Sequence, residues 1–193
     1  MKNPEYEEGG HDEKKDLFLF ELDGDLYAVP VELVDRVMKI PPITPIPNAP
    51  AAIVGIFHLR GKVVLTLDLS SRMGISRMKP LSQNFLFVVR YKNDQFAILI
   101  DTPKVIVHIP ASEIHRPDSI LTARLSPQYV QGTFMFQEVT KVKVPNHSIF
   151  IEHIGGVDRR PEEIPPSLRP VLLLDLERVL DQEDLQHMFI SQE

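Results

Sequence analysis

The stretch Pro47–Leu69, PNAPAAIVGIFHLRGKVVLTLDL, contains two apolar runs separated by a Leu-Arg-Gly segment. The runs Ile53–Phe57 and Val63–Leu69 are rich in the residues that favour strands packed on a core. Arg60-Gly61 stands between them, and glycine accepts the positive φ that a tight hairpin turn requires. The stretch therefore predicts a β-hairpin with Arg60 at its tip, where the arginine is either a solvated surface charge or an anchor for a partner.

The chain also contains an internal duplication. An apolar run at Phe18–Leu22, a polar turn and the run Tyr27–Val29 form one hairpin pattern. Phe85–Val89, a second polar turn and Phe96–Ile98 repeat it. Each half continues with further short apolar segments, so the sequence predicts a mainly β protein built as a pair of small β-barrels.

Each half ends in an Asp-Leu pair followed by a short helical pattern. Asp68 and Asp175 occupy these matching positions, and both lie where a strand is expected to give way to a helix. A carboxylate at that position accepts hydrogen bonds from free backbone N–H groups. We therefore expect the two aspartates to be N-caps rather than a pair of acid–base catalysts.

The two halves differ in length near their ends. Gly55 and Asp68 are much closer in sequence than Gly132 and Asp175, which indicates an insertion in the second half at about 134–169. Such an insertion is expected to be removable, since loop closure depends only weakly on loop length. The expected organisation is a disordered charged tail over 1–16, two intertwined barrels over 17–181, and a helical tail over 182–193.

Composition excludes several functional classes. The chain has 193 residues and no cysteine, so disulfides, thiolate zinc sites and a thiol nucleophile are absent. Its formal net charge of −6 argues against a protein that binds nucleic acid through phosphate contacts. No apolar run is long enough to cross a bilayer and the N-terminus lacks a signal-peptide core, so we expect a cytoplasmic protein.

The sequence motifs that would indicate catalysis, metal binding or nucleotide binding are weak. Gly55, Gly61 and Lys62 fail as a phosphate-binding loop because the glycine spacing is too long and Val63 replaces the Ser/Thr that binds Mg²⁺. The seven histidines are scattered without metal-ligand spacing, and no serine lies in a nucleophile-elbow context. The sequence therefore favours a binding protein with no catalytic, metal or cofactor site.

The order of short motifs resembles the CheW-like coupling domain of bacterial chemotaxis. The similarity covers about residues 16–180, interrupted by the insertion. It is carried by Ala28-Val29-Pro30-Val31, Val34-x-x-Val37, Ile43-Thr44-Pro45-Ile46-Pro47, Val54-Gly55-Ile56, Leu59-Arg60-Gly61, Leu67-Asp68-Leu69, Ile100-Asp101, Val130-x-Gly132 and Leu174-Asp175-Leu176.

The resemblance implies two SH3-like, five-stranded β-barrel subdomains around a shared core, with short helices and a C-terminal helix. It further implies a non-catalytic adaptor without cofactors, which couples receptors to a kinase in a signalling array. The implied partners are the cytoplasmic tips of chemoreceptors (methyl-accepting chemotaxis proteins) and the regulatory domain of a CheA-type histidine kinase. Nucleic acid and direct membrane insertion are not implied, and the location is the cytoplasm, at membrane-associated receptor arrays.

Matched by position, Arg60 corresponds to the family's receptor-coupling arginine and Gly61 to its turn glycine. Two residues depart from the family pattern: His58 replaces the usual Asn before Leu-Arg-Gly, and Arg36 replaces a frequent Glu in the segment that begins at Val34. An acid-to-base change reverses the local charge and therefore alters partner choice. The expected partner-binding residues are thus Arg60, Gly61, His58, Arg36 and Val34.

Two other functions stay open at this point. One is a divergent CheW-like scaffold for another chemosensory-like pathway, such as pilus motility, which the two departures and the insertion favour. The other, from a different class, is a β-barrel that binds a small molecule or an oligonucleotide, although no basic aromatic platform supports the latter.

Overall fold

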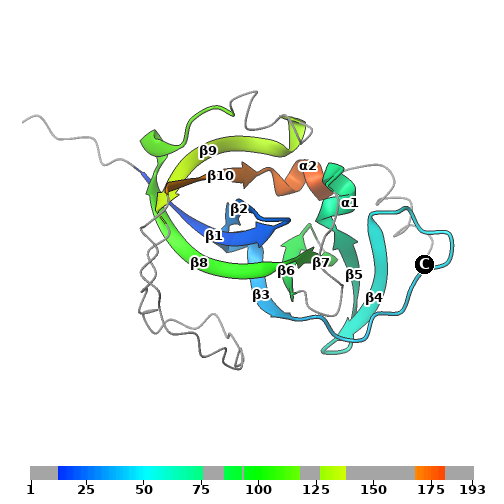
Figure 1. Ribbon diagram of the computed structural model, residues 1–193. Coiled ribbons are helices and arrows are strands. Elements are labelled where there is room, and N and C mark those ends of the chain that lie inside the picture. The colour runs from blue at the N-terminus through cyan, green and yellow to red at the C-terminus, as the bar shows by residue number, and fades with distance from the viewer. Residues whose placement is uncertain (1–12, 76–84, 93, 118–126, 138–167, 181–193) are drawn as a thin grey trace, which may run out of the picture.

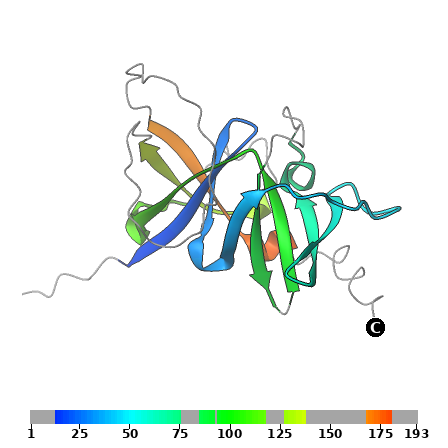
Figure 2. The same ribbon diagram turned by 90° about the horizontal axis from the view of Figure 1, so that it is seen from below.

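The computed structural model describes residues 13–75, 85–92, 94–117, 127–137 and 168–180 (Figure 1). Within these residues, ten strands form two five-stranded sheets that lie next to each other in both views (Figure 1 and Figure 2). One sheet has the order β8 (Thr102–Pro110), β1 (Lys14–Leu22), β2 (Asp25–Pro30), β10 (Leu168–Leu174) and β9 (Val130–Gln137). The other has the order β3 (Val34–Lys39), β6 (Phe85–Tyr91), β7 (Asp94–Ile100), β5 (Lys62–Asp68) and β4 (Ile53–Leu59).

The two halves of the duplication exchange their hairpins. The β1–β2 hairpin of the first half joins β8, β9 and β10 of the second half, and the β6–β7 hairpin joins β3, β4 and β5 of the first. Each exchanged hairpin is attached through a parallel pair, β2 with β10 and β7 with β5. Each half therefore depends on the other for a complete sheet, which confirms the expected mainly β fold of two intertwined units.

Each sheet closes into a barrel at equivalent places. Thr44, which follows edge strand β3, exchanges backbone hydrogen bonds of 2.8 and 2.9 Å with Ile56 on the opposite edge strand. His115, which follows β8, does the same with Thr133, again at 2.8 and 2.9 Å. We call the sheet that contains β4 and β5 the Arg60 barrel, and the sheet that contains β9 and β10 the insertion barrel.

A glycine stands beside each closure and makes it possible. A Cβ on Gly55 would lie 2.3 Å from the carbonyl oxygen of Thr44, and the φ of Gly55 is +148°. A Cβ on Gly132 would lie 2.6 Å from Cγ2 of Ile114. The matching glycines of the two halves are therefore required because the barrel edges approach closely.

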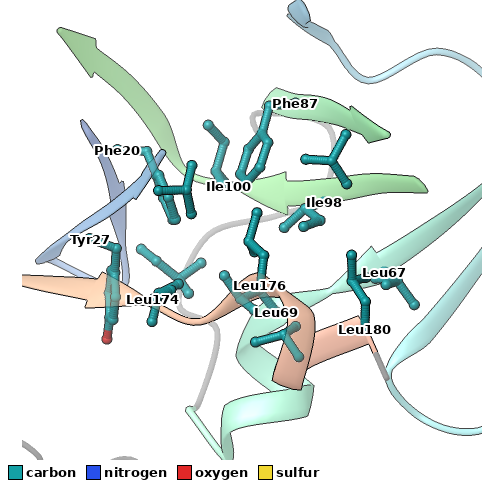
Figure 3. Packing of buried hydrophobic residues seen from close by; sticks show 14 of the residues in the cluster. Phe20, Tyr27, Leu67, Leu69, Phe87, Ile98, Ile100, Leu174, Leu176 and Leu180 are labelled. Carbon is teal, nitrogen blue, oxygen red and sulfur yellow. The ribbon is translucent and has the colours of Figure 1, made fainter. Parts of the chain in front are cut away.

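The hairpin strands are buried on both faces. Phe20, Tyr27, Phe87 and Ile98 face a core shared by the two barrels, as Figure 3 shows. Alternate residues of the same strands fill the barrel interiors. Phe20 and Phe87, one from each barrel, have ring centroids 5.3 Å apart. Burial on both faces explains why these strands have continuous apolar runs instead of alternating apolar and polar residues.

Two short helices end the halves, and both N-caps are as expected. Asp68 accepts a 2.9 Å hydrogen bond from the Ser70 N–H at the start of α1 (Leu69–Met73), which ends at Gly74 with φ +74°. Asp175 accepts a 3.1 Å hydrogen bond from the Arg178 N–H of α2 (Leu176–Leu180). The aspartates thus satisfy free backbone groups, which confirms the capping prediction.

Several expected boundaries change. β1 begins at Lys14, inside the expected tail of 1–16, whose first twelve residues lie outside the described part of the chain. Phe134 belongs to β9 and is only 2% exposed, and Arg169 belongs to β10. The segment between these strands is therefore 138–167, shorter than the expected insertion of about 134–169, and it lies outside the described residues. The helical tail expected over 182–193 also lies outside them.

Candidate functional site: the Arg60 hairpin

The β4–β5 hairpin places Arg60 on a tight turn, as the sequence predicts. Leu59 pairs with Lys62, so only Arg60 and Gly61 form the connection. Their φ angles are +50° and +79°, the pattern of a type I′ turn, whose twist matches that of the flanking strands. A Cβ on Gly61 would meet no atom within 4 Å, so the glycine is needed for its φ angle and not for space. The turn therefore holds Arg60 in a defined position.

Arg60 is exposed at the tip. No hydrogen bond or ion pair joins it to any other residue in the part of the chain that the structure describes. An arginine held this way keeps all its donors for an external acceptor, and its planar guanidinium suits bidentate pairing with a carboxylate.

The side chains around the tip form a small mixed surface. His58 lies directly opposite Val63 across the hairpin, and both are exposed, Val63 by 47%. Lys62, beside the turn, is exposed as well. We call His58, Arg60, Lys62 and Val63 the Arg60 surface. It combines an apolar contact with two positive charges, a composition that fits an amphipathic partner with acidic residues.

Val63 is the member of this surface that the sequence pattern places wrongly. Leu65 and Leu67 lie on the same face of β5 as Val63 and are buried in the shared core. The alternation therefore predicts that Val63 is buried too, but on this face of β5 the core ends at Leu65. A strand pattern identifies a face of the sheet, and it does not say how far along the strand that face is covered.

Arg36 and Val34 lie on β3, away from the hairpin. Val34 is half-buried and packs against the shared core. In the sheet, β6 and β7 separate β3 from β5, so these residues do not lie on a strand that pairs with the hairpin next to its tip. The pairings Val34–Val89, Val89–Phe96 and Phe96–Leu65 place them towards the same end of the barrel as Arg60. The structure thus brings His58, Arg60 and Gly61 together, with Arg36 and Val34 as a separate group.

Arg36 is engaged within the protein. Its Nε donates a 2.8 Å hydrogen bond to Oδ2 of Asp35, and Nη2 of Arg90 donates a 2.5 Å bond to Oδ1. Hydrogen bonding from Arg90, together with that from Arg36 and the charge of both guanidinium groups, lowers the pKa of Asp35 below its ordinary value, against the opposing effect of burial. Asp35 and Arg90 are functional candidates that the residue pattern does not reveal, because their strands are remote in sequence.

The insertion barrel has a different surface at the equivalent place. Aligned from Gly55 and Gly132, Met135 corresponds to His58 and Gln137 to Arg60. Gln137 pairs with Leu168, where the Arg60 barrel has its two-residue turn. Met135 and Leu168 are 49% and 62% exposed, so this end is apolar where the Arg60 surface is basic.

Other kinds of site are not formed by the described residues. Among them, no three His, Cys, Asp or Glu side chains gather closely enough to hold a metal ion. In the same part of the chain, none of the helices has the length and hydropathy to span a membrane.

Comparison with known proteins identifies the family. The CheW-like domain model matches residues 16–184. Chemotaxis protein CheW of Rhizobium meliloti (strain 1021) is 24% identical over 123 residues, which is 64% of this chain and 79% of the relative. Chemotaxis protein CheW of Treponema pallidum (strain Nichols) is 24% identical over 126 residues, 63% of this chain and 74% of the relative.

A solved structure shows the same fold. The scaffolding protein TtCheW from Thermoanaerobacter tengcongensis superimposes with a TM-score of 0.64 at 19% identity, over 93% of this chain and 96% of that chain. The two closed sheets are thus the SH3-like barrels that the motif order implies. Because the family model spans most of the chain, the protein belongs to the CheW-like domain family.

Proposed function

We propose that this protein is a non-catalytic adaptor of bacterial chemotaxis signalling that couples chemoreceptors to a CheA-type histidine kinase. Membership of the CheW-like domain family supports the adaptor role. The observation that carries the receptor contact is Arg60, an exposed arginine held on a type I′ turn with no partner among the described residues.

The Arg60 surface is the proposed receptor contact. Its two cations and the apolar Val63 suit a receptor helix that presents carboxylates beside aliphatic side chains. Arg36 and Val34, on strand β3 of the same barrel, form a second part of the proposed partner-binding surface. Because Arg36 and Arg90 both pair with Asp35, this second part offers less free charge than the Arg60 tip. We propose that it adjusts partner choice and contributes less affinity.

Reconstitution tests the adaptor role. Receptor cytoplasmic fragments, a CheA-type kinase and this protein are mixed, and kinase autophosphorylation is followed. We expect receptors to control the kinase only when this protein is present, and Arg60→Ala to abolish that control. Arg116→Ala is the matched control, since Arg116 is an exposed arginine of the insertion barrel. Receptor control that is independent of this protein would contradict the proposal.

A scaffold of another chemosensory-like pathway, such as pilus motility, is the second candidate. The observation that favours it is the Arg36–Asp35–Arg90 group, which places basic residues where the family often has Glu. The same reconstitution with receptors and kinases from flagellar and pilus pathways separates the two. The pathway whose components respond to this protein is the one it serves.

A further inference from the structure

Two long basic residues occupy backbone conformations that favour other residue types. Among the described residues, the non-glycine residues with positive φ are Asp23, Asn48, Arg60 and Lys92. Aspartate and asparagine tolerate this left-handed conformation, whereas arginine and lysine are strained in it, because the Cβ lies close to the following carbonyl oxygen. Residues held in such conformations cluster at functional sites. Turn chemistry alone therefore does not explain why Arg60 and Lys92 stand where they do.

The two basic residues begin equivalent turns on nearby hairpins of one barrel. The strands β4 and β5, and likewise β6 and β7, pair up to the turn itself, so each connection has two residues and starts with the basic one. The strands that follow the turns, β5 and β7, pair in parallel, so both tips lie at the same end of the Arg60 barrel. The β1–β2 hairpin, which repeats β6–β7 in the insertion barrel, begins its turn with Asp23 instead, and the Asp23 N–H donates to Asp101. The basic residues are therefore specific to this barrel and are not a consequence of the duplication.

The side chains between the two tips lie on one face of the sheet. Leu65 and Phe96 are partners on β5 and β7, and both face the shared core. The same register continued by two residues places Val63 level with Asp94 on that face, and both are exposed. Tyr91, which pairs with Asp94, also packs against the shared core, with its ring centroid 6.5 Å from that of Phe96. The exposed continuation of the shared core thus reaches from the Arg60 surface to the β6–β7 turn.

Lys92 is exposed and lies over this continuation. Its Nζ is 4.9 Å from the centroid of the Tyr91 ring, so the cation sits beside a half-buried aromatic side chain. Tyrosine and arginine are among the residue types enriched in the energetic centres of protein interfaces. We call Tyr91, Lys92 and Asp94 the Tyr91 surface. Like the Arg60 surface, it combines a cation with an apolar contact.

The charges of the two surfaces define the kind of partner. The cations of the Arg60 surface lie at one side and Lys92 at the other, and each side attracts a carboxylate. Asp94 repels a third carboxylate placed between them. Val63 and Tyr91 supply apolar contacts next to the cations. A helix presents such a pattern, since its residues three or four positions apart lie on one face.

We propose that the Arg60 surface and the Tyr91 surface bind the same partner, an amphipathic helix with carboxylates at both ends of its contact face and apolar residues between them. The proposal rests on the proposed function, in which this helix belongs to the chemoreceptor. It adds Tyr91 and Lys92 to the receptor contact, and it gives Asp94 the role of excluding helices with an acidic residue at the middle of the face.

Substitutions that remove a cation and keep the turn test the proposal. Asparagine is favoured in the left-handed positions of two-residue hairpin turns, so Arg60→Asn and Lys92→Asn preserve the backbone. Lys39→Asn is the matched control, because Lys39 is an exposed lysine of the same barrel and pairs with Phe85, at the end of β6 away from the turn. Each variant is titrated against receptor cytoplasmic fragments at low and high salt, titrated against the kinase regulatory domain, and unfolded with urea.

We expect receptor affinity to fall about thirtyfold in Arg60→Asn, about fivefold in Lys92→Asn and not at all in Lys39→Asn. Added salt should weaken receptor binding less in Arg60→Asn and Lys92→Asn than in the wild type, since each has lost a charge pair. Urea should unfold Lys92→Asn like the wild type, because relief of the left-handed strain offsets the lost contact with Tyr91.

The possible outcomes separate this proposal from the proposed function. Wild-type receptor affinity in Lys92→Asn, beside weak binding by Arg60→Asn, would overturn the proposal and leave the proposed function intact. Weakened binding of the kinase alone in Lys92→Asn would assign the Tyr91 surface to the kinase, and would overturn the proposal as well. A wild-type protein that does not bind the receptor fragments would contradict the proposed function and the proposal together.

Discussion

The two barrels have the same architecture and differ at the exposed tips of their hairpins. Both close through a strand-edge bridge beside a glycine, and both end at an aspartate-capped helix. Their hairpins diverge at the tips: the Arg60 barrel has a two-residue turn bearing an arginine, and the insertion barrel has residues 138–167 between Gln137 and Leu168. The duplication thus keeps the features that the fold needs and varies the exposed tips of the two hairpins.

The largest expected effect concerns the closures. Gly55→Ala places a Cβ 2.3 Å from a backbone oxygen at φ +148°, and we expect a loss of about 3 kcal/mol or more in unfolding free energy. Gly132→Ala meets first the movable Cγ2 of Ile114 and should cost about 1–2 kcal/mol. Urea unfolding of both variants measures the difference. Equal losses would contradict the prediction, because they would mean that both closures tolerate an added Cβ equally well.

The second prediction concerns a variant in which the insertion barrel has a short turn like that of the Arg60 barrel. Because Gln137 and Leu168 are a strand pair, residues 138–167 can be replaced by Asn-Gly, which forms a type I′ turn. Loop closure then costs less, so stability should stay the same or rise by up to about 2 kcal/mol. Deleting the wider range 134–169 is the control and should prevent folding, because it removes buried Phe134. Loss of folding in the Asn-Gly variant would assign 138–167 to the barrel.

The third prediction compares the caps. Asp68 is 8% exposed and accepts from both Ser70 and Ser71, so Asp68→Ala should cost about 2 kcal/mol. The carboxylate of Asp175 is more exposed, so Asp175→Ala should lower the unfolding free energy by only about 1 kcal/mol. Thermal unfolding of both variants decides the order. A larger loss at Asp175 would contradict it.

The smallest effect concerns Asp35, whose pair Arg90 is largely exposed. The pKa of Asp35 is lowered from 3.8 by Arg90 first, so its ion pairs stabilise the folded state above that pH. The contribution is lost as the pH falls through the lowered pKa. Asp35→Asn should therefore cost less than about 1 kcal/mol at pH 7, and progressively less as the pH falls below 3.8. A difference from the wild type that does not shrink as the pH is lowered would assign Asp35 another role.

Much of this architecture is predictable from the residues. The hairpins, the turn at Arg60-Gly61 and the capping by Asp68 and Asp175 follow from local chemistry, which acts over a few residues. The exposure of Val63 and the Asp35–Arg90 pair do not, because they depend on where the shared core ends and on which strands become neighbours. The ends of the strands that flank residues 138–167 also cannot be predicted. An apolar residue such as Phe134 occurs both in strands and in insertions, so its identity alone does not show to which of the two it belongs.

One titration tests the central claim that Arg60 is the receptor anchor. Wild type, Arg60→Ala and Arg60→Lys are titrated against receptor cytoplasmic fragments and against the kinase regulatory domain. Both variants should melt like the wild type, since Arg60 is exposed and has no partner among the described residues. Receptor affinity should fall about thirtyfold in Arg60→Ala, and also in Arg60→Lys because lysine lacks the planar fork, while kinase binding changes less. Unchanged receptor affinity, or unfolding of Arg60→Ala, would contradict the claim and leave Arg60 as a solvated charge on a hairpin.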